Sequence, residues 1–151
     1  MELVRRIMTI PKIWDVATED GQDYKYWQPA DNDKRNWVIA TDDIGLVGVI
    51  YIHSDNCYTA KLHPYVIPKR KGKGGYMIKA FFSWFLRHWP WCVKLVASIP
   101  VCYPRVCQLA QRLGFSQEGI NTASYKKNGE LHDQLFLGIS SEKMREVILW
   151  V

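Results

Sequence analysis

Long apolar runs are missing from this sequence, although nearly half of its 151 residues are apolar. A helix that crosses a bilayer needs roughly 20 consecutive apolar residues, and no segment approaches that length. The N-terminal segment carries Arg5 and Arg6 but lacks the apolar core of a secretion signal. We therefore expect a soluble, cytoplasmic protein without a membrane partner.

The sequence also lacks the cysteine and histidine spacing of a metal site. It has four cysteines and four histidines, but no Cys-x-x-Cys pair and no His-x₃-His pattern. The cysteines lie in apolar stretches, which favours buried free thiols over disulfides. We expect no metal. The residues are Cys57, Cys92, Cys102 and Cys107, and His53, His63, His88 and His132.

The length and charge of the chain narrow the range of functions further. A chain of 151 residues suits one domain with a proper core and is too short for two comfortable ones, so we expect a single domain over residues 1–151. The formal net charge of +5 favours an anionic partner, either nucleic acid or an anionic cofactor. Because the cations concentrate between Lys69 and Lys79, a discrete anionic ligand is favoured over a broad DNA-binding face.

Hydrophobic periodicity predicts a mixed α/β domain. Helical spacing is clearest from Met77 to Trp89, and Pro90 ends that helix. Gly114 is placed to cap a later helix, and Asn128-Gly129 predicts a hairpin turn. Strand–helix–strand units predict parallel pairing in the middle of the sheet, and hairpins predict antiparallel pairing at its sides. The predicted strands are 3–8, 37–40, 46–52, 58–67, 93–99 and 135–139, and the predicted helices are 11–16, 77–89 and 106–113.

The segment Lys69-Arg70-Lys71-Gly72-Lys73-Gly74-Gly75 is the most informative feature of the sequence. It places glycines among four cations, between an extended stretch and an amphipathic helix. Glycines let an anion approach the backbone closely and leave the amide N–H groups unobstructed, and the helix N-terminus adds partial positive charge. The segment therefore predicts a phosphate or pyrophosphate site, with a solvated basic turn as the alternative.

This loop resembles the pyrophosphate-binding signature of the GNAT superfamily of N-acetyltransferases. The family pattern is Gln/Arg-x-x-Gly-x-Gly/Ala at the start of a helix. The segment from Lys69 to Gly74 matches it with both glycines in place and lysine at the first position. Leu113-Gly114-Phe115 is similar to the Leu-Gly-Phe that ends a later helix in the family. The resemblance spans residues 36–140, and less fully the first 35.

The resemblance implies an α/β fold of the acyl-CoA N-acyltransferase type, with a central mixed sheet flanked by helices. It implies acetyl-CoA as the donor and an amine as the acceptor. In the family the pantetheine arm lies between two splayed strands, which correspond here to residues 59–66 and 93–99. A deprotonated amine attacks the thioester, a base or water chain takes the proton, and an acid can protonate the thiolate. The implied cofactor-binding residues are Val66, Lys69, Arg70, Lys71, Gly72, Lys73, Gly74 and Gly75.

Three positions depart from the family pattern. Many members carry a tyrosine, the acid for the thiolate, where this sequence has Ala110. An asparagine that is common earlier in the family's helix is replaced by Tyr103, which is either a displaced acid or a packing residue beside Pro104. The fourth strand lacks the family's glutamate, and its candidate base near neutral pH is His63. A structural histidine is the alternative for that residue.

Two further functions fit the same residues. The sequence is also similar to small acetyltransferase-like proteins of tailed bacteriophages, in the run from His132 to Phe136. That similarity implies a host-cytoplasm or virion location and a catalytically silent protein that contacts a virion or host protein. Alternatively, the basic loop with Trp27, Trp37 and Trp91 serves nucleic acid through phosphate contacts and base stacking. Packing in the core is the other interpretation of these tryptophans.

The acceptor and the oligomeric state are open at this stage. In the family, the first helices and the end of the chain build the acceptor pocket, so aromatic residues of the N-terminal segment are candidates to line it. They are Trp14, Tyr24, Tyr26 and Trp27. The apolar C-terminus, with Trp150, is predicted to dock either on its own sheet or on a second subunit of a homodimer.

Overall fold

Six strands form a mixed sheet at the centre of the computed structural model, which describes residues 1–149. The strands are β1 (Arg35–Asp42), β2 (Gly45–Ser54), β3 (Thr59–Val66), β4 (Lys94–Pro100), β5 (Ser116–Lys127) and β6 (Glu130–Ser140). The helices are α1 (Glu2–Met8), α2 (Pro11–Ala17), α3 (Gly74–His88), α4 (Pro104–Arg112) and α5 (Ser141–Leu149), with a short 3₁₀ helix η1 (Pro68–Arg70). None of the helices described within residues 1–149 has the length and apolar character needed to cross a membrane.

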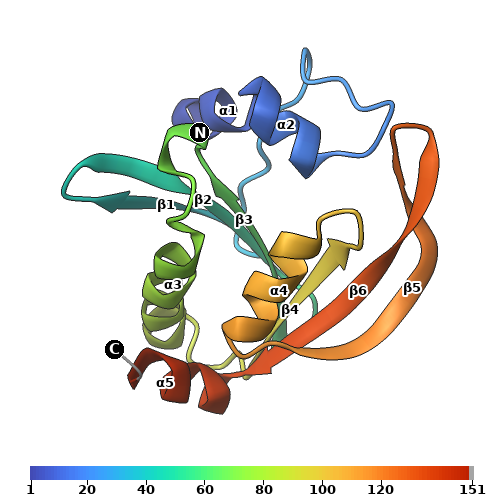
Figure 1. Cartoon of the computed structure of the whole chain (residues 1–151). Coiled ribbons are helices and arrows are strands. Elements are labelled where there is room, and N and C mark those ends of the chain that lie inside the picture. The colour runs from blue at the N-terminus through green and yellow to red at the C-terminus, as the bar shows by residue number, and fades with distance from the viewer. Residues whose placement is uncertain (150–151) are drawn as a thin grey trace.

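The strand order across the sheet is β1-β2-β3-β4-β6-β5 (Figure 1). β3 and β4 run parallel, and the other neighbouring pairs are antiparallel. The parallel pair is joined by α3, which crosses over between the two strands. The predicted α/β class, with parallel pairing in the middle and hairpins at both sides, is confirmed.

The sheet separates two hydrophobic cores, and β2 contributes to both because successive side chains of a strand point to opposite faces. Ile50 and Ile52 belong to the larger core, which α3 and α4 cover. Val49 belongs to the smaller core, beneath α1 and α2. The central strands are therefore covered by helices on both faces.

Helix α3 follows the apolar spacing that the sequence predicts, and it begins three residues earlier, at Gly74. Phe82 and Phe85 are fully buried on its inner face. Truncating such a phenylalanine to alanine typically costs about 3–5 kcal/mol, so this helix is firmly held. Its N-terminus is consequently fixed at the end of the glycine loop.

The predicted opening strand over residues 3–8 is wrong, because this segment is the helix α1. Val4, Ile7 and Met8 are the buried residues, and they recur at spacings of three and four rather than two. One helical face therefore reaches the small core. The sheet loses its predicted first strand, and β1 becomes its edge.

Strands β3 and β4 pair only over a short stretch and then separate. The parallel register joins Thr59, Ala60 and Lys61 to Lys94, Leu95 and Val96, and it stops there. Beyond Lys61 the two strands diverge, and β4 stays paired with β6 as far as Pro100. A V-shaped gap therefore opens in the middle of the sheet, between the segments that the resemblance assigned to the splayed strands.

The C-terminal part of the chain forms a long hairpin and a final helix. Strands β5 and β6 extend well beyond the strand segments predicted there and meet at Asn128 and Gly129, as predicted. Helix α5 is not among the predicted elements, and it buries Met144 and packs on α3. The described C-terminus thus docks on its own chain, while Trp150 lies outside the described residues.

Candidate functional site

A cavity of about 520 Å³ occupies the gap between the splayed strands. On one side it reaches α3 and α4, through Ile78, Leu109 and Leu113. On the other side it reaches the end of α2, through Val16 and Ala17. The cavity therefore passes between β3 and β4 from one face of the sheet to the other. Its volume lies within the range of about 300–1,000 Å³ typical of small-molecule sites.

The glycine loop lies directly after β3 and runs through η1 into α3. The N–H groups of Lys71 and Lys73 donate to carbonyls within the loop. The N–H groups of Gly74 and Gly75 stand in the first turn of α3, where a helix offers no acceptor one turn earlier. The sequence-predicted anion site therefore has unpaired backbone donors at the helix N-terminus, next to the cavity residue Leu109.

Gly72 and Gly74 of the loop differ in what the backbone requires of them. Gly72 has a φ of +95°, in the left-handed region that side-chain-bearing residues avoid. Gly74 is helical, and a Cβ there would lie 3.4 Å from Leu109 and 3.7 Å from Val66, which is ordinary contact. Gly72 is thus required by the backbone, whereas the fold itself would accept a small side chain at Gly74.

The four cations of the loop divide into two groups. Lys69, Lys71 and Lys73 are exposed, and the Lys73 ammonium lies 5.4 Å from the Tyr76 ring centroid. Arg70 is mostly buried and forms an ion pair with Asp42. The three lysines are thus placed to attract an anion, and Arg70 is engaged in holding the loop.

Asp42 connects the loop to the turn between β1 and β2. Its carboxylate accepts hydrogen bonds from the N–H groups of Ile44, at 3.0 Å, and Gly45, at 3.2 Å, besides the contact with Arg70. Although partial burial opposes the shift, these N–H groups and the guanidinium lower the pKa of Asp42. The ionised carboxylate therefore links the glycine loop to the edge of the sheet.

His63 lines the cavity from β3 and contacts His53 of β2. The Nε2 atoms of the two rings lie 3.4 Å apart, and the rings stack with centroids 5.5 Å apart. Burial, together with the charges of His53 and Lys61, lowers the pKa of His63 to about 4. His63 is therefore neutral at neutral pH and only weakly basic.

The hydrogen-bond acceptors around this pair favour one arrangement of ring protons. The Nδ1 of His53 lies 3.4 Å from the Ser54 carbonyl, which can only accept. With the proton of His53 on Nδ1, its Nε2 accepts from the Nε2–H of His63. The Nδ1 of His63 is then left with a free lone pair.

Tyr103 lines the cavity where α4 begins, at the N-cap of that helix. Its hydroxyl is buried and has no hydrogen-bond partner within the described residues, and the same holds for Ser98 of β4, another lining residue. Buried hydroxyls are normally paired, so both are candidates for contact with a ligand. Ala110, at the family's tyrosine position, also lines the cavity and has no group that could act as an acid.

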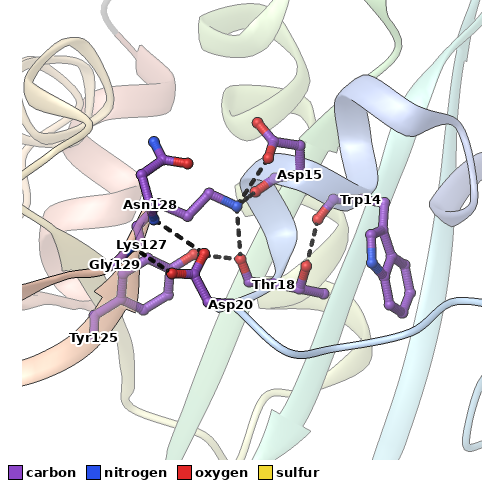
Figure 2. A network of polar contacts seen from close by, with 8 residues as sticks. All are labelled: Trp14, Asp15, Thr18, Asp20, Tyr125, Lys127, Asn128 and Gly129. Carbon is purple, nitrogen blue, oxygen red and sulfur yellow. Dashed lines mark hydrogen bonds and ion pairs between the residues drawn. The ribbon is translucent and has the colours of Figure 1, made fainter.

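The hairpin β5–β6 lines the α2 side of the cavity through Tyr125, and Lys127 lies two residues further along the same strand (Figure 2). The Tyr125 hydroxyl donates to the Thr18 carbonyl at 2.9 Å. The Lys127 ammonium donates to the same carbonyl at 3.2 Å and lies 2.9 Å from the Asp15 carboxylate. Although burial opposes the shift, the bond to Asp15 raises the pKa of Lys127. The hairpin is thus tied to the end of α2 by a charged side chain.

Asp20 completes this connection at the tip of the hairpin. Its carboxylate accepts hydrogen bonds from the N–H groups of Asn128, at 3.0 Å, and Gly129, at 2.8 Å (Figure 2). Asp20 and the neighbouring Lys127 contacts form what we call the α2–hairpin latch. The sequence analysis missed it, because its partners are more than one hundred residues apart and no local pattern couples them.

The N-terminal aromatics that were candidates to line the acceptor pocket do not line this cavity. Trp14 packs edge-on against Tyr24 and Trp27, with centroids 5.9 Å apart in both pairs, and none of these rings lines the cavity. Tyr26 is exposed and also lies outside the lining. The N-terminal aromatics therefore build the small-core side of the fold, and the aromatic rings at the cavity are those of Tyr65, Tyr103, Phe115 and Tyr125.

Two of the three tryptophans considered for base stacking are also packed. Trp27 and Trp37 meet edge-on, and the Trp37 indole N–H donates to the Ala30 carbonyl at 2.8 Å. Trp91 is exposed and stacks on Trp89. These contacts give Trp27 and Trp37 a structural role.

The cysteines are all free, as predicted, but they are not all buried. Cys92 and Cys107 are buried, Cys102 is partly exposed, and Cys57 is exposed in the turn after β2. No cluster of three or more potential metal ligands occurs among residues 1–149.

The fold is that of N-acetyltransferases of known structure. The spermidine N-acetyltransferase from Vibrio cholerae in complex with CoA and spermine aligns with a TM-score of 0.79, over 95% of this chain and 91% of that one, at 16% identity. Mutant forms of the spermidine/spermine N-acetyltransferase from the same organism align with a TM-score of 0.69, over 76% of this chain and 72% of theirs, at 19% identity. No protein-family model and no curated protein sequence matches the chain.

Proposed function

We propose that the protein is an N-acetyltransferase that moves an acetyl group from acetyl-CoA to an amine. The observation that carries the proposal is the cavity in the gap between β3 and β4, whose lining residue Leu109 also lies beside Gly74 of the glycine loop. A donor that enters from the loop and an acceptor that enters from α2 would meet inside it. The fold shared with N-acetyltransferases, one of them bound to CoA and spermine, supports the same assignment.

The glycine loop has the chemistry that the CoA pyrophosphate requires. The N–H groups of Gly74 and Gly75 would donate to its oxygens, and the helix N-terminus adds partial positive charge. Lys69, Lys71 and Lys73 would supply charge, including toward the 3′-phosphate. Val66 would flank the arm as it enters the gap, since it lies against Gly74. Arg70 contributes by fixing the loop through Asp42.

The reaction converts an ammonium and a thioester into an amide, a thiol and one released proton. The amine nitrogen, once deprotonated, forms the new C–N bond at the thioester carbon, and the C–S bond breaks. The sulfur leaves as a thiolate and takes a proton from an acid, and the nitrogen loses a second proton as the amide forms, which restores that acid. The cavity supplies candidates for both proton transfers, because His63 and Tyr103 line it together.

His63 would act as the base through its free Nδ1. A low pKa makes it a poor final acceptor for a proton. The Nδ1 of His63 would take the amine proton while its Nε2 proton passes to the partly exposed ring of His53. His63 would then never carry a positive charge. The protonated His53 would then lose its Nε2 proton to water.

Tyr103 would act as the acid for the leaving thiolate. Its hydroxyl is unpaired in the described part of the chain, so a bond to the sulfur would replace no existing one. It stands on the helix that carries the family's tyrosine position, now Ala110.

The test is acetyl transfer by the purified full chain. Release of CoA thiol is followed on addition of acetyl-CoA and a panel of primary amines, and mass spectrometry identifies the acetylated amine. Amine-dependent release with a matching product supports the proposal. Binding of acetyl-CoA without transfer to any amine or peptide would overturn it and favour a silent protein on the same fold, for which Ala110 is the motivating residue.

A further inference from the structure

The acceptor half of the cavity offers very little negative charge. Among its lining residues, Glu19 is the single carboxylate. Two other carboxylates lie near the end of α2, but both are engaged: Asp15 pairs with Lys127, and Asp20 accepts the hairpin N–H groups. A linear polyamine carries several ammonium groups at neutral pH, and each needs a partner when it leaves water. This cavity has one carboxylate to offer.

A lysine on the β3 side of the cavity would repel a second ammonium group of the acceptor. Lys61 lines the cavity from β3, close enough to His63 for its charge to lower the pKa of that ring. His63 itself is uncharged at neutral pH and neither attracts nor repels an ammonium strongly. A second ammonium on the acceptor would therefore meet Lys61 rather than a carboxylate.

Most of the remaining lining of this half is apolar or aromatic, and its other polar side chains, such as those of Gln22 and Gln134, are uncharged. Val16 and Ala17 contribute from α2, Pro100 from β4, and the rings of Tyr103 and Tyr125 from α4 and the hairpin. The Tyr125 hydroxyl donates its proton to the Thr18 carbonyl, so it offers a ligand only its oxygen lone pairs. Such a surface gains free energy by covering an apolar body.

We propose that the acceptor is a monoamine with an apolar body, of the arylalkylamine class, rather than a polyamine. Its single ammonium pairs with Glu19 as it enters, and its apolar body packs against the end of α2 and the tyrosine rings. This inference rests on the proposed acetyl transfer and specifies the substrate class of the same site. It separates this chain from the Vibrio cholerae enzymes, which are named for spermidine.

The test compares kcat/KM for 2-phenylethylamine and tryptamine with kcat/KM for spermidine and putrescine, with acetyl-CoA at saturation. We expect the arylalkylamines to exceed spermidine by at least about tenfold, as an ammonium without a partner costs at least that much. A spermidine value equal to or above the arylalkylamine values overturns the inference while leaving acetyl transfer in place. Transfer to no amine overturns the proposed function and the inference together.

A charge variant tests the cause of the preference. Val16 is half-exposed at the cavity, so a polar side chain is tolerated there. Val16→Asp adds the missing second carboxylate and should raise the spermidine-to-phenylethylamine ratio about tenfold. Val16→Asn has nearly the shape of the aspartate variant without its charge and should give a clearly lower ratio than Val16→Asp. Equal ratios in the two variants contradict the charge argument.

Discussion

The Nε2 atoms of His53 and His63 lie 3.4 Å apart, across neighbouring strands at the wall of the cavity. In the register of β2 and β3, His63 stands opposite Tyr51 and His53 opposite Lys61, so the two histidines are offset by two positions. Two histidines this close cannot both be charged without strong repulsion. One is therefore kept neutral, and burial selects His63.

This relationship predicts that the protein loses stability as pH falls through the window between the unfolded and folded pKa values of His63. Between pH 6.5 and about 4 the unfolded chain binds a proton at His63 and the folded chain does not, so stability falls with pH by up to about 3 kcal/mol. His63→Gln should flatten this slope in urea unfolding at pH 7, 5.5 and 4.5. His132→Gln, outside the pair, is the control, and an unchanged slope in His63→Gln contradicts the neutral buried ring.

The variant Tyr103→Phe tests whether Tyr103 acts as the acid or only packs beside Pro104. Its hydroxyl has no partner in the described residues, so its removal should leave thermal stability unchanged or raise it slightly. If Tyr103 protonates the thiolate, kcat should fall roughly 10²-fold in single-turnover measurements. Ser98→Ala removes the other unpaired hydroxyl of the cavity and should not produce this loss. Unchanged turnover in Tyr103→Phe means that Tyr103 is not the acid.

Breaking the contact between Asp42 and Arg70 should weaken the donor site from a distance. Asp42→Ala leaves every loop cation in place but frees Arg70, so the loop loses its attachment to the β1–β2 turn. We expect acetyl-CoA affinity to fall about tenfold because the loop is no longer preorganised. Asp43→Ala, one residue along the same turn, is the control. Equal affinity in both variants would show that the loop needs no anchor.

The α2–hairpin latch should affect the acceptor rather than the donor. The N–H groups of Gly129 and Asn128 hold the pKa of Asp20 below its usual value, so the latch stays closed at neutral pH and is lost only as pH falls through that lowered value. Asp20→Ala should raise KM for the amine several-fold and leave acetyl-CoA affinity unchanged. The control is Asp31→Ala, which removes the same charge from the loop before β1. If Asp20→Ala changes the affinity for acetyl-CoA and Asp31→Ala does not, the assignment of the hairpin side of the cavity to the acceptor is wrong.

The parts of the fold that the sequence predicted correctly are those with local signals. The apolar spacing of α3, the cap at Gly114 and the turn at Asn128 and Gly129 each lie within one element or turn. The opening segment was misread because seven residues contain two helical turns at most, and its three buried positions are easily taken for a strand. Helix α5 was missed although Ser140 marks its start, where the Ser140 hydroxyl accepts a hydrogen bond from the Lys143 N–H.

The residues of the candidate site also separate into those that local sequence signals predict and those that only the folded chain brings together. The glycine loop and His63 were recognisable because a family pattern or a residue type marks them in one stretch of sequence. The partner of Arg70, the pairing of His63 with His53 and the latch all join distant segments. The charge of the acceptor cavity depends on which carboxylates are already engaged, and only the folded chain reveals that Asp15 and Asp20 are.

The donor site is the central claim, and calorimetric titration with acetyl-CoA, with ATP as the control ligand, tests it most directly. The measurement compares the wild type with Gly74→Ala and Gly74→Val, since the fold accepts a small side chain at this position. We predict micromolar binding of acetyl-CoA by the wild type, weaker binding by Gly74→Ala and none by Gly74→Val, with similar melting temperatures throughout. Absence of binding in the wild type, or equal affinity in Gly74→Val, would contradict the account.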